Sequence, residues 1–175
     1  MQERGDEALM KAYANGDMEA FRVLYDRHRG PLYRYILRQA GDPATANDLY
    51  QGSWEKIIRA RNSYRATAPF RAWLFRIAHN HVMDYFRRSR PVSELQTESV
   101  ATDNPGPEQS LQNENRECDL REAIEQLPPE QKDTLLLKLE AGLDLNAIAE
   151  LTGVSSETAK SRLRYAVAKL KRTLQ

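Results

Sequence analysis

The fold of this chain is decided by residues 69 to 90, PFRAWLFRIAHNHVMDYFRRSR. Pro69 suits the first turn of a helix, and no later residue in the stretch breaks one. At about 3.6 residues per turn, one face of such a helix is largely apolar. Its members are Phe70, Leu74, Ile77, Ala78, His81 and Tyr85. We therefore predict a long amphipathic helix that packs this face against the core.

A second stripe of the same helix mixes aromatic, amide and guanidinium side chains. Its members are Trp73, Arg76, Asn80, Met83 and Arg87. Unpaired bases need flat rings to stack on, donors for their edges and cations for their phosphates. The stripe is therefore a candidate surface for single-stranded nucleic acid. A buried helix with Trp73 in its core and solvated arginines explains the same pattern.

Three further helices are expected before this one. The first runs from Asp6 to Ala14, and Asp17 can cap the second. Gly30-Pro31 is expected to interrupt the second helix, after which the apolar pattern resumes. The third runs from about residue 44 to residue 60, and residues 61 to 68 lead as a loop into Pro69.

The chain divides into three parts by composition. Residues 91 to 117 are rich in Ser, Thr, Asn, Gln, Glu and Pro and hold few large apolar residues. Such a segment buries too little surface to fold alone. We therefore predict an all-α protein, with an N-terminal helical domain over residues 1 to 90, a flexible acidic linker over 91 to 117 and a C-terminal helical domain over 118 to 175.

The C-terminal domain is expected to carry a helix-turn-helix. A helix starting at Leu127-Pro128-Pro129, with Leu135, Leu136 and Leu139 inside, ends near Gly142. Asp144 can then cap a short helix, and Ser155 can cap a longer basic one after the turn at residues 152 to 154. A short helix, a Gly-containing turn and a basic helix make this DNA-binding motif.

The last helix separates into a core stripe and an exposed basic side. The core stripe is Ala159, Leu163, Ala166 and Leu170. Base edges are expected to meet the exposed N-terminal half, where we place Ser156, Glu157, Thr158, Lys160, Ser161 and Arg164. Arg162, Lys169, Lys171 and Arg172 are better placed for phosphates. A basic helical hairpin that binds nothing is the alternative.

The net charge of +1 conceals a strong segregation of charge. Residues 1 to 90 hold 16 Lys and Arg against 10 Asp and Glu, and residues 154 to 175 hold 6 against 1. Residues 91 to 119 hold 1 against 7, and residues 120 to 153 hold 3 against 7. Two basic segments separated by an acidic one favour nucleic acid as a partner.

The composition is that of a water-soluble protein, with 41% hydrophobic and 29% charged residues and a mean hydropathy of −0.71. No apolar run approaches the roughly 18 residues that span a membrane. The N-terminus, MQERGDE, lacks the basic and apolar regions of a signal peptide. Cys118 is the only cysteine, which excludes an internal disulfide and favours the cytoplasm.

Nothing in the sequence points to catalysis. His79 and His81 lie about 200° apart around a helix and cannot share a metal ion. Cys118 has no histidine near it in the sequence, and no Gly-rich phosphate loop is present. We therefore expect no enzyme activity, no metal and no cofactor. An enzyme acting on nucleic acid would need a metal or a pair of acids that the sequence does not offer.

Three motifs resemble the extracytoplasmic-function (ECF) class of bacterial RNA polymerase sigma factors. They are ANDLYQGSW (residues 46 to 54), PFRAWLFRIAHNHVMDYFRR (69 to 88) and LPPEQKDTLLLKLEAGLDLNAIAELTGVSSETAKSRLRYAVAKLK (127 to 171). Together they cover nearly the whole chain apart from the linker, in the family's order. The resemblance implies a subunit that directs core RNA polymerase to promoters and assists melting in transcription initiation. The first domain would read the −10 element as single-stranded DNA, and the second the −35 element as duplex.

The family resemblance also implies roles for particular residues. A flipped −10 base would enter a pocket formed by Lys56, Ala60, Tyr64, Ile77 and Asn80. The clamp helices of the polymerase would dock on Asp48, Leu49, Gln51 and Glu55. An ordinary solvated helix face explains the polar members of that second set equally well. One departure from the family is Gly52, which costs about 1 kcal/mol inside a helix relative to Ala.

The resemblance further implies an anti-sigma factor that covers the polymerase-binding faces until a stress or envelope signal releases the protein. The linker would thread through the polymerase toward its RNA exit channel, although a plain tether explains its composition as well. The main rival is a stand-alone helix-turn-helix transcriptional regulator that never contacts polymerase. That rival accounts for residues 144 to 172 but not for the Asp48 to Glu55 patch or the Trp73 and Asn80 stripe.

Overall fold

The computed structural model of the chain describes residues 3 to 89 and 111 to 175, with side chains in the second part from residue 114 onward. Throughout these residues the regular structure is helical, without strands, which confirms the predicted all-α fold class. No helix among them is long and apolar enough to cross a membrane. The predicted linker, up to residue 110, lies outside the described residues.

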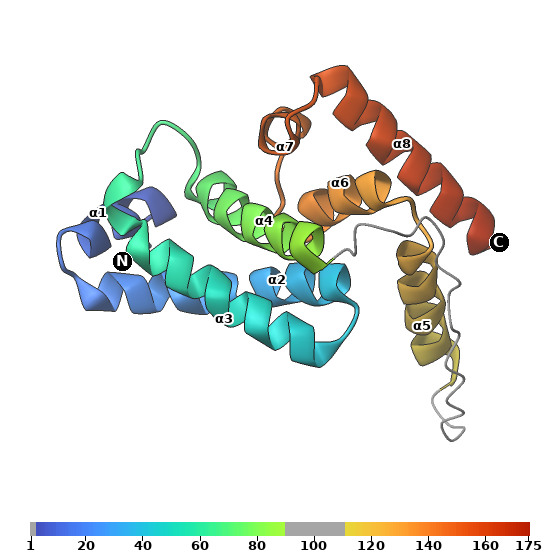
Figure 1. Cartoon of the computed structure of the whole chain (residues 1–175), viewed down its shortest axis with the longest axis horizontal. Helices are drawn as coiled ribbons and strands as arrows, with labels where there is room; N and C mark the ends of the chain where they lie inside the picture. The colour runs from blue at the N-terminus through green and yellow to red at the C-terminus, as the bar shows by residue number, and fades with distance from the viewer. Residues whose placement is uncertain (1–2, 90–110) are drawn as a thin grey trace.

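The N-terminal domain consists of four α-helices and one turn of 3₁₀ helix (Figure 1). They are α1 (Asp6–Ala14), α2 (Met18–Ala40), α3 (Pro43–Arg59), η1 (Arg61–Ser63) and α4 (Phe70–Ser89). Asp17 caps α2 by accepting hydrogen bonds from the backbone N–H groups of Glu19 and Ala20. Asp42 caps α3 through Thr45 N–H at 2.8 Å. Helix α3 packs against both α2 and α4, so these three helices form the body of the domain.

Helix α2 runs without a break through Gly30-Pro31, where the sequence predicted an interruption. Pro31 removes one backbone donor and costs several kcal/mol in an isolated helix. The helix persists because its residues on both sides of the proline are buried, among them Leu24, Leu32 and Ile36. Burial of that apolar face outweighs the local cost of the proline.

The core face of α4 also differs from the predicted stripe. Phe70, Leu74 and Ala78 are buried as expected, but Tyr85 is exposed and His81 and Ile77 are only half-buried. The other buried members of the helix are Phe75, His79 and Val82. The buried face is therefore rotated away from Ile77 and Tyr85 toward Phe75 and His79.

Helix α1 is fastened to α2 through the carboxylate of Asp6. The ionised carboxylate only accepts hydrogen bonds, so His28 Nε2–H donates to it at 2.7 Å and Arg27 donates at 2.9 Å. Burial lowers the pKa of His28, and the nearby Asp6 charge opposes this only in part. Burial would raise the pKa of Asp6, but the hydrogen bond from Arg27 and the charge of His28 outweigh it and lower that pKa.

The C-terminal domain consists of α5 (Leu111–Glu125), α6 (Pro129–Leu139), α7 (Leu145–Thr152) and α8 (Ser156–Thr173). Helix α5 begins at Leu111, so the last residues of the predicted linker are helical. In α6 the buried leucines are Leu135, Leu136 and Leu137, whereas Leu139, predicted to be inside, is 62% exposed. A helix that is buried over one wide face places three successive leucines toward its neighbours, and Leu139 falls outside that face.

The two domains pack against each other. Helix α6 lies on α2, and α7 lies on α4 (Figure 1). Helix α8 lies on the outer side of the C-terminal domain, where it packs on α6 and α7.

Candidate nucleic-acid interface

The start of α4 is held by a side chain of α1, the first helix of the domain. The backbone N–H of Phe70 donates a hydrogen bond to Glu7 Oε1 of α1 at 3.0 Å. A carboxylate at a helix N-terminus satisfies a free N–H group and interacts favourably with the helix dipole. This contact fixes the start of α4, and the fully buried ring of Phe70 anchors it to the core. Trp73 therefore lies at a defined position one turn later.

The loop before α4 brings aromatic rings and cations together. Tyr64 packs edge-on against Phe70 and Trp73, with ring centroids 5.9 and 5.3 Å apart. A cavity of about 220 Å³ lies beside Trp73. Its lining is Ser63, Arg65, Thr67, Ala68, Ala72, Trp73 and Arg76. An indole flanked by two guanidinium groups offers a stacking surface for a base and charges for its phosphate.

The residues of the pocket implied by the family resemblance come from α3, from the segment between α3 and α4, and from α4. Lys56 and Asn80 are exposed, and Ala60 and Ile77 are half-buried. The ring of Tyr64 contacts Phe70 and Trp73, and its hydroxyl donates a 3.4 Å hydrogen bond to the carbonyl of Ala68. Base capture by these residues therefore remains a prediction. Arg76 and Arg87, also predicted to contact −10 DNA, are exposed and ion-paired with Glu150 and Asp84.

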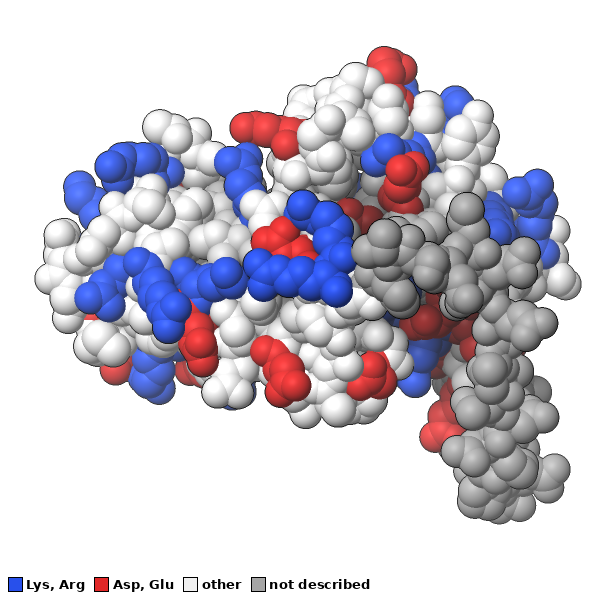
Figure 2. Space-filling view, in the orientation of Figure 1, with Lys and Arg blue, Asp and Glu red and all other residues white. Residues whose placement is uncertain are grey.

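The His81 ring packs against α3 at Gly52, a position where only glycine leaves room for it. A Cβ at Gly52 would come within 2.5 Å of His81 Nε2. Burial lowers the pKa of His81, and the neighbouring positive charges of Lys56 and Arg88 lower it further. His81 is therefore neutral at pH 7, and it joins α4 to α3 under a surface rich in cations. Figure 2 shows Lys and Arg side chains in a band across the face on which α3 and α4 lie in front.

Three of the four predicted polymerase-docking residues share the exposed side of α3. Asp48, Gln51 and Glu55 are solvent-exposed and spaced three or four residues apart. Leu49 is only 3% exposed and packs in the core, so it supports the helix from beneath and offers no contact surface. The side chains available to a partner are thus two carboxylates and one amide.

The C-terminal domain forms the predicted helix-turn-helix from α7 and α8. Asp144 caps α7 through Ala147 N–H at 2.8 Å, and Ser155 caps α8 through Thr158 N–H at 3.1 Å. Gly153, with φ of 73°, makes the left-handed turn between them, which disfavours any residue with a Cβ. A 2.8 Å hydrogen bond from Ser156 to Asn146 joins the N-terminal ends of the two helices.

The exposed side of α8 carries most of the predicted −35 residues. Ser156, Glu157, Lys160 and Arg164 are exposed, and Thr158 and Ser161 are half-buried. Arg162 differs, because its guanidinium is turned toward α6 and pairs with Glu130 at 3.4 Å. Helix geometry explains this, since Arg162 precedes the half-buried Leu163 of the core stripe and lies next to the face that packs on α6.

One exposed aromatic residue on α8 was not among the predicted contacts. Tyr165 is 55% exposed, and the guanidinium carbon of Arg164 lies 5.2 Å from its ring centroid. This cation–π contact holds Arg164 over the ring, which limits its rotamers. An aromatic next to an arginine on the polar side of a predicted recognition helix was the signal available in the sequence.

Two family models match the two domains. Sigma-70 region 2 matches residues 24–92, and Sigma-70, region 4 matches residues 119–170. Among curated relatives, the ECF RNA polymerase sigma factor SigL of Mycobacterium tuberculosis is 35% identical, over 96% of each chain. The RNA polymerase sigma factor CarQ of Myxococcus xanthus is 29% identical over 94% of this chain and 95% of its own.

Solved structures show the same fold. The first is CnrH in complex with the cytosolic domain of CnrY, with a TM-score of 0.71 and 24% identity over 97% of this chain and 96% of CnrH. The second is the sigma factor RpoE of Bartonella quintana in complex with the anti-sigma factor NepR, with a TM-score of 0.67 and 21% identity over 88% of this chain and 96% of RpoE. With the full-length similarity to SigL, the two matched regions confirm the resemblance: the chain belongs to the extracytoplasmic-function class of RNA polymerase sigma factors.

Proposed function

We propose that this sigma factor reads the −10 element through α4 and the loop before it, and the −35 element through α8. The observation that carries the proposal is that one chain presents two different surfaces whose side chains suit DNA binding. The first combines Tyr64, Trp73 and Arg76, which suit an unpaired strand. The second is a capped recognition helix with exposed polar side chains, which suits the major groove of duplex DNA.

Promoter melting would follow from capture of a base. Flipping a base out of the duplex costs a few kcal/mol, and stacking and hydrogen bonds in a protein pocket offset that cost. In our proposal Tyr64 or Trp73 supplies the ring, Asn80 the hydrogen bonds and Lys56 the charge. No reaction chemistry is required, in keeping with a family of initiation factors that are not enzymes.

We place the polymerase contact on Asp48, Gln51 and Glu55. Carboxylates and amides along one helix face suit docking on a helical coiled coil such as the clamp helices, and the side chains stand clear of the core. An anti-sigma factor is the second protein partner we propose, since CnrH and RpoE, which share this fold, are each bound to another protein in the solved complexes. We place the activity in the cytoplasm, where bacterial transcription takes place.

The decisive experiment is in vitro transcription with bacterial core polymerase on a genomic DNA library. We expect transcript starts that require this protein and share two upstream elements. If transcription is independent of the protein while residues 118 to 175 bind a specific duplex, the chain acts as a stand-alone helix-turn-helix regulator. A pull-down of core polymerase with the full chain separates the two functions directly.

A substitution tests the base-capture step. Asn80→Ala should lose about 1–3 kcal/mol of discrimination at one −10 base, because the amide no longer bonds the base edge. Polymerase binding should be unchanged, since Asn80 lies on α4 and the proposed docking residues lie on α3. Asn15→Ala, an equivalent change in the exposed turn between α1 and α2, serves as the control. Equal use of all four bases by the unmodified protein would rule out the pocket.

A further inference from the structure

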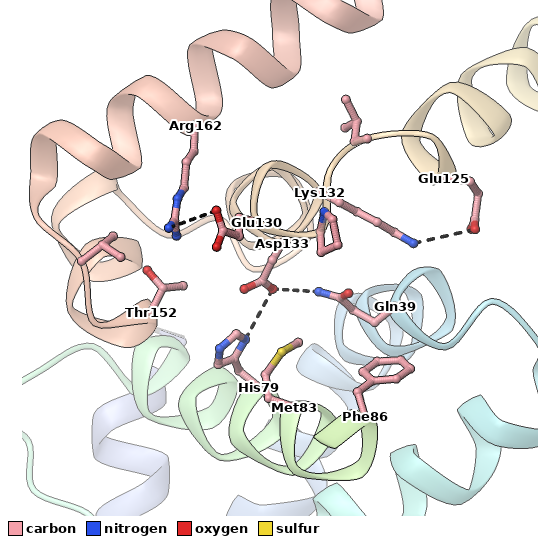
Figure 3. Close-up of a pocket in the computed structure, with 13 residues that line it drawn as sticks. Gln39, His79, Met83, Phe86, Glu125, Glu130, Lys132, Asp133, Thr152 and Arg162 are labelled. Carbon is pink, nitrogen blue, oxygen red and sulfur yellow. Dashed lines mark hydrogen bonds and ion pairs between the residues drawn. The ribbon is translucent and has the colours of Figure 1, made fainter. Parts of the chain in front are cut away.

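A cavity of about 480 Å³ lies between helix α4 and the C-terminal domain (Figure 3). Its volume falls within the range of about 300–1,000 Å³ that small-molecule pockets occupy. Its walls come from α2, from α4 and from all four helices of the C-terminal domain. Of the residues that we propose for DNA or polymerase contact, only Arg162 lines it. The cavity is therefore a feature that the proposed function does not use.

Polar side chains of α2 and α4 surround the carboxylate of Asp133 in the wall of the cavity (Figure 3). An ionised carboxylate only accepts hydrogen bonds. The Gln39 amide therefore donates to it through Nε2 at 2.7 Å, and the Tyr35 hydroxyl donates at 3.0 Å. The Tyr35 oxygen is left to accept a hydrogen bond from His79 Nδ1 at 3.0 Å. Asp133 thus fixes the orientation of both the amide and the imidazole.

Two acceptor atoms beside Asp133 have no hydrogen bond to any residue that the structure describes. They are the side-chain carbonyl oxygen of Gln39 and Nε2 of His79, and both residues line the cavity. With its proton on Nδ1, the neutral imidazole carries a lone pair on Nε2. His79 is only 7% exposed, so bulk water has little access to this acceptor. A molecule that enters the cavity therefore gains most if it brings a hydrogen-bond donor.

The charged groups of the lining are largely paired with one another. Lys132 lies 3.7 Å from a carboxylate oxygen of Glu125, and Arg162 lies 3.4 Å from one of Glu130. Asp133 is the remaining charge, so the lining holds three carboxylates against two cations. This balance disfavours an anionic ligand and accepts a neutral one.

The rest of the lining is apolar and suits a flat ring. Its members are Met83, Phe86, Leu127, Pro129 and Val154. Met83, Phe86 and Val154 are only half-buried, so they keep apolar surface that a ligand can cover. A methionine sulfur and a phenylalanine ring both make favourable contacts with an aromatic partner.

We propose that this cavity binds a small, neutral aromatic molecule that carries one hydrogen-bond donor, of the indole or phenol class. The donor meets His79 Nε2 or the Gln39 oxygen, and the ring lies against Met83 and Phe86. Because the lining comes from both domains, the ligand holds them in the arrangement described and stabilises the folded chain by mass action.

The site is tested by nuclear magnetic resonance of the full chain with ¹³C-labelled methionine methyl groups, titrated with indole at about pH 8, which favours neutral histidine. The Met83 signal, identified with Met83→Leu, should shift and saturate at a concentration on the order of 1 mM. Met10, buried in α1, and Met18, which is 64% exposed, are internal references that should not shift. A Met83 signal that does not move at about 10 mM indole overturns the site.

Two further compounds test the chemical class of the ligand without changing the protein. Benzofuran has the shape of indole but an oxygen in place of the N–H donor, so it should bind about three- to tenfold more weakly. Indole-3-carboxylate adds a negative charge and should also bind more weakly than indole. Equal affinities for indole and benzofuran overturn the acceptor role of His79 and Gln39. Tighter binding of the carboxylate overturns the preference for a neutral ligand.

Substitutions test the position of the ligand. Phe86→Ala removes part of the apolar wall and should weaken indole binding about fivefold. Tyr85→Ala is the matched control, because Tyr85 is the neighbouring aromatic residue of α4, is exposed and does not line the cavity. Val154→Phe, which adds volume inside the cavity and keeps Phe86, should weaken binding as well. An equal loss in Phe86→Ala and Tyr85→Ala, or unchanged binding in Val154→Phe, overturns the placement.

Discussion

At the scale of single residues, Gly52 is unfavourable within its own helix but is required by the contact between α3 and α4. Glycine in a helix interior loses about 1 kcal/mol relative to alanine. In this fold the missing Cβ is what allows α3 to approach the His81 ring of α4. The local cost is therefore offset by a close contact between two helices.

Gly52→Ala should destabilise the protein by about 1–2 kcal/mol, despite the better helix propensity, because the new methyl group would displace the His81 ring. In a His81→Ala background the same substitution should instead stabilise it by up to about 1 kcal/mol. Urea unfolding of the four proteins gives the coupling energy. If Gly52→Ala has the same effect in both backgrounds, the two residues are not in contact.

The sequence identified Gly52 as costly but offered no reason for it. The reason lies in a residue 29 positions later along the chain, His81, and depends on how closely two helices cross. Leu49 illustrates the converse. Its position within a surface motif suggested an external contact, whereas its apolar side chain is buried in the core.

At the scale of helices, α8 separates two arginines that were both predicted to contact −35 DNA, Arg164 at base edges and Arg162 at phosphates. Arg164 is exposed over the Tyr165 ring, and Arg162 pairs with Glu130 of α6. Arg164→Ala should therefore weaken −35 duplex binding by about 1–3 kcal/mol if it reads a base. Arg162→Ala should change DNA binding less than this. Fluorescence anisotropy with labelled duplexes measures both, and a larger loss for Arg162→Ala would contradict the assignment.

The attachment of α1 predicts sensitivity to acid. The folded pKa of His28 lies below its ordinary value of 6.5, so near that pH the unfolded chain binds more protons than the folded one. The stability contributed by neutral His28 is complete above about pH 6.5 and is lost as the pH falls below it. Asp6, whose pKa is also lowered, adds a further loss at lower pH.

Urea unfolding from about pH 7 to about pH 5 should show a falling free energy of unfolding. His28→Gln, which keeps a donor for Asp6 but does not titrate, should reduce the slope. The slope will not vanish, because the lowered pKa of His81 acts in the same direction. An unchanged slope in His28→Gln would mean that the histidine titrates normally.

Helix starts followed well from capping residues, whereas the break predicted at Gly30-Pro31 and the buried faces of the helices did not. Asp17, Asp42, Asp144 and Ser155 cap helices as local chemistry requires. The buried face of α4 was predicted wrongly because its apolar residues nearly encircle the helix. Phe75 and His79 are buried by packing on Tyr35 and on the C-terminal domain, contacts that no local pattern encodes.

At the scale of the whole molecule, the docked domains predict cooperative unfolding. A helical domain as small as the C-terminal one is marginal alone, and it is stabilised here by contacts with α2 and α4. We expect one thermal transition for the unmodified protein and two for Asp133→Ala, because Asp133 of α6 accepts hydrogen bonds from Tyr35 and Gln39 of α2 that this variant loses. Circular dichroism and calorimetry measure both. Two transitions in the unmodified protein would contradict the coupling.

The hydrogen bond from Phe70 N–H to Glu7 also sets an order of events during synthesis. Helix α1 leaves the ribosome first, and its partner in α4 follows 63 residues later. At about 5–20 residues per second, several seconds separate the synthesis of Glu7 from that of Phe70, whose N–H group donates to it. Until then α1, a nine-residue segment too short to be a stable helix by itself, is held by its contacts with α2. Helix α1 therefore completes its contacts only once α4 is made, and it does so by starting the helix that we propose meets the melted promoter.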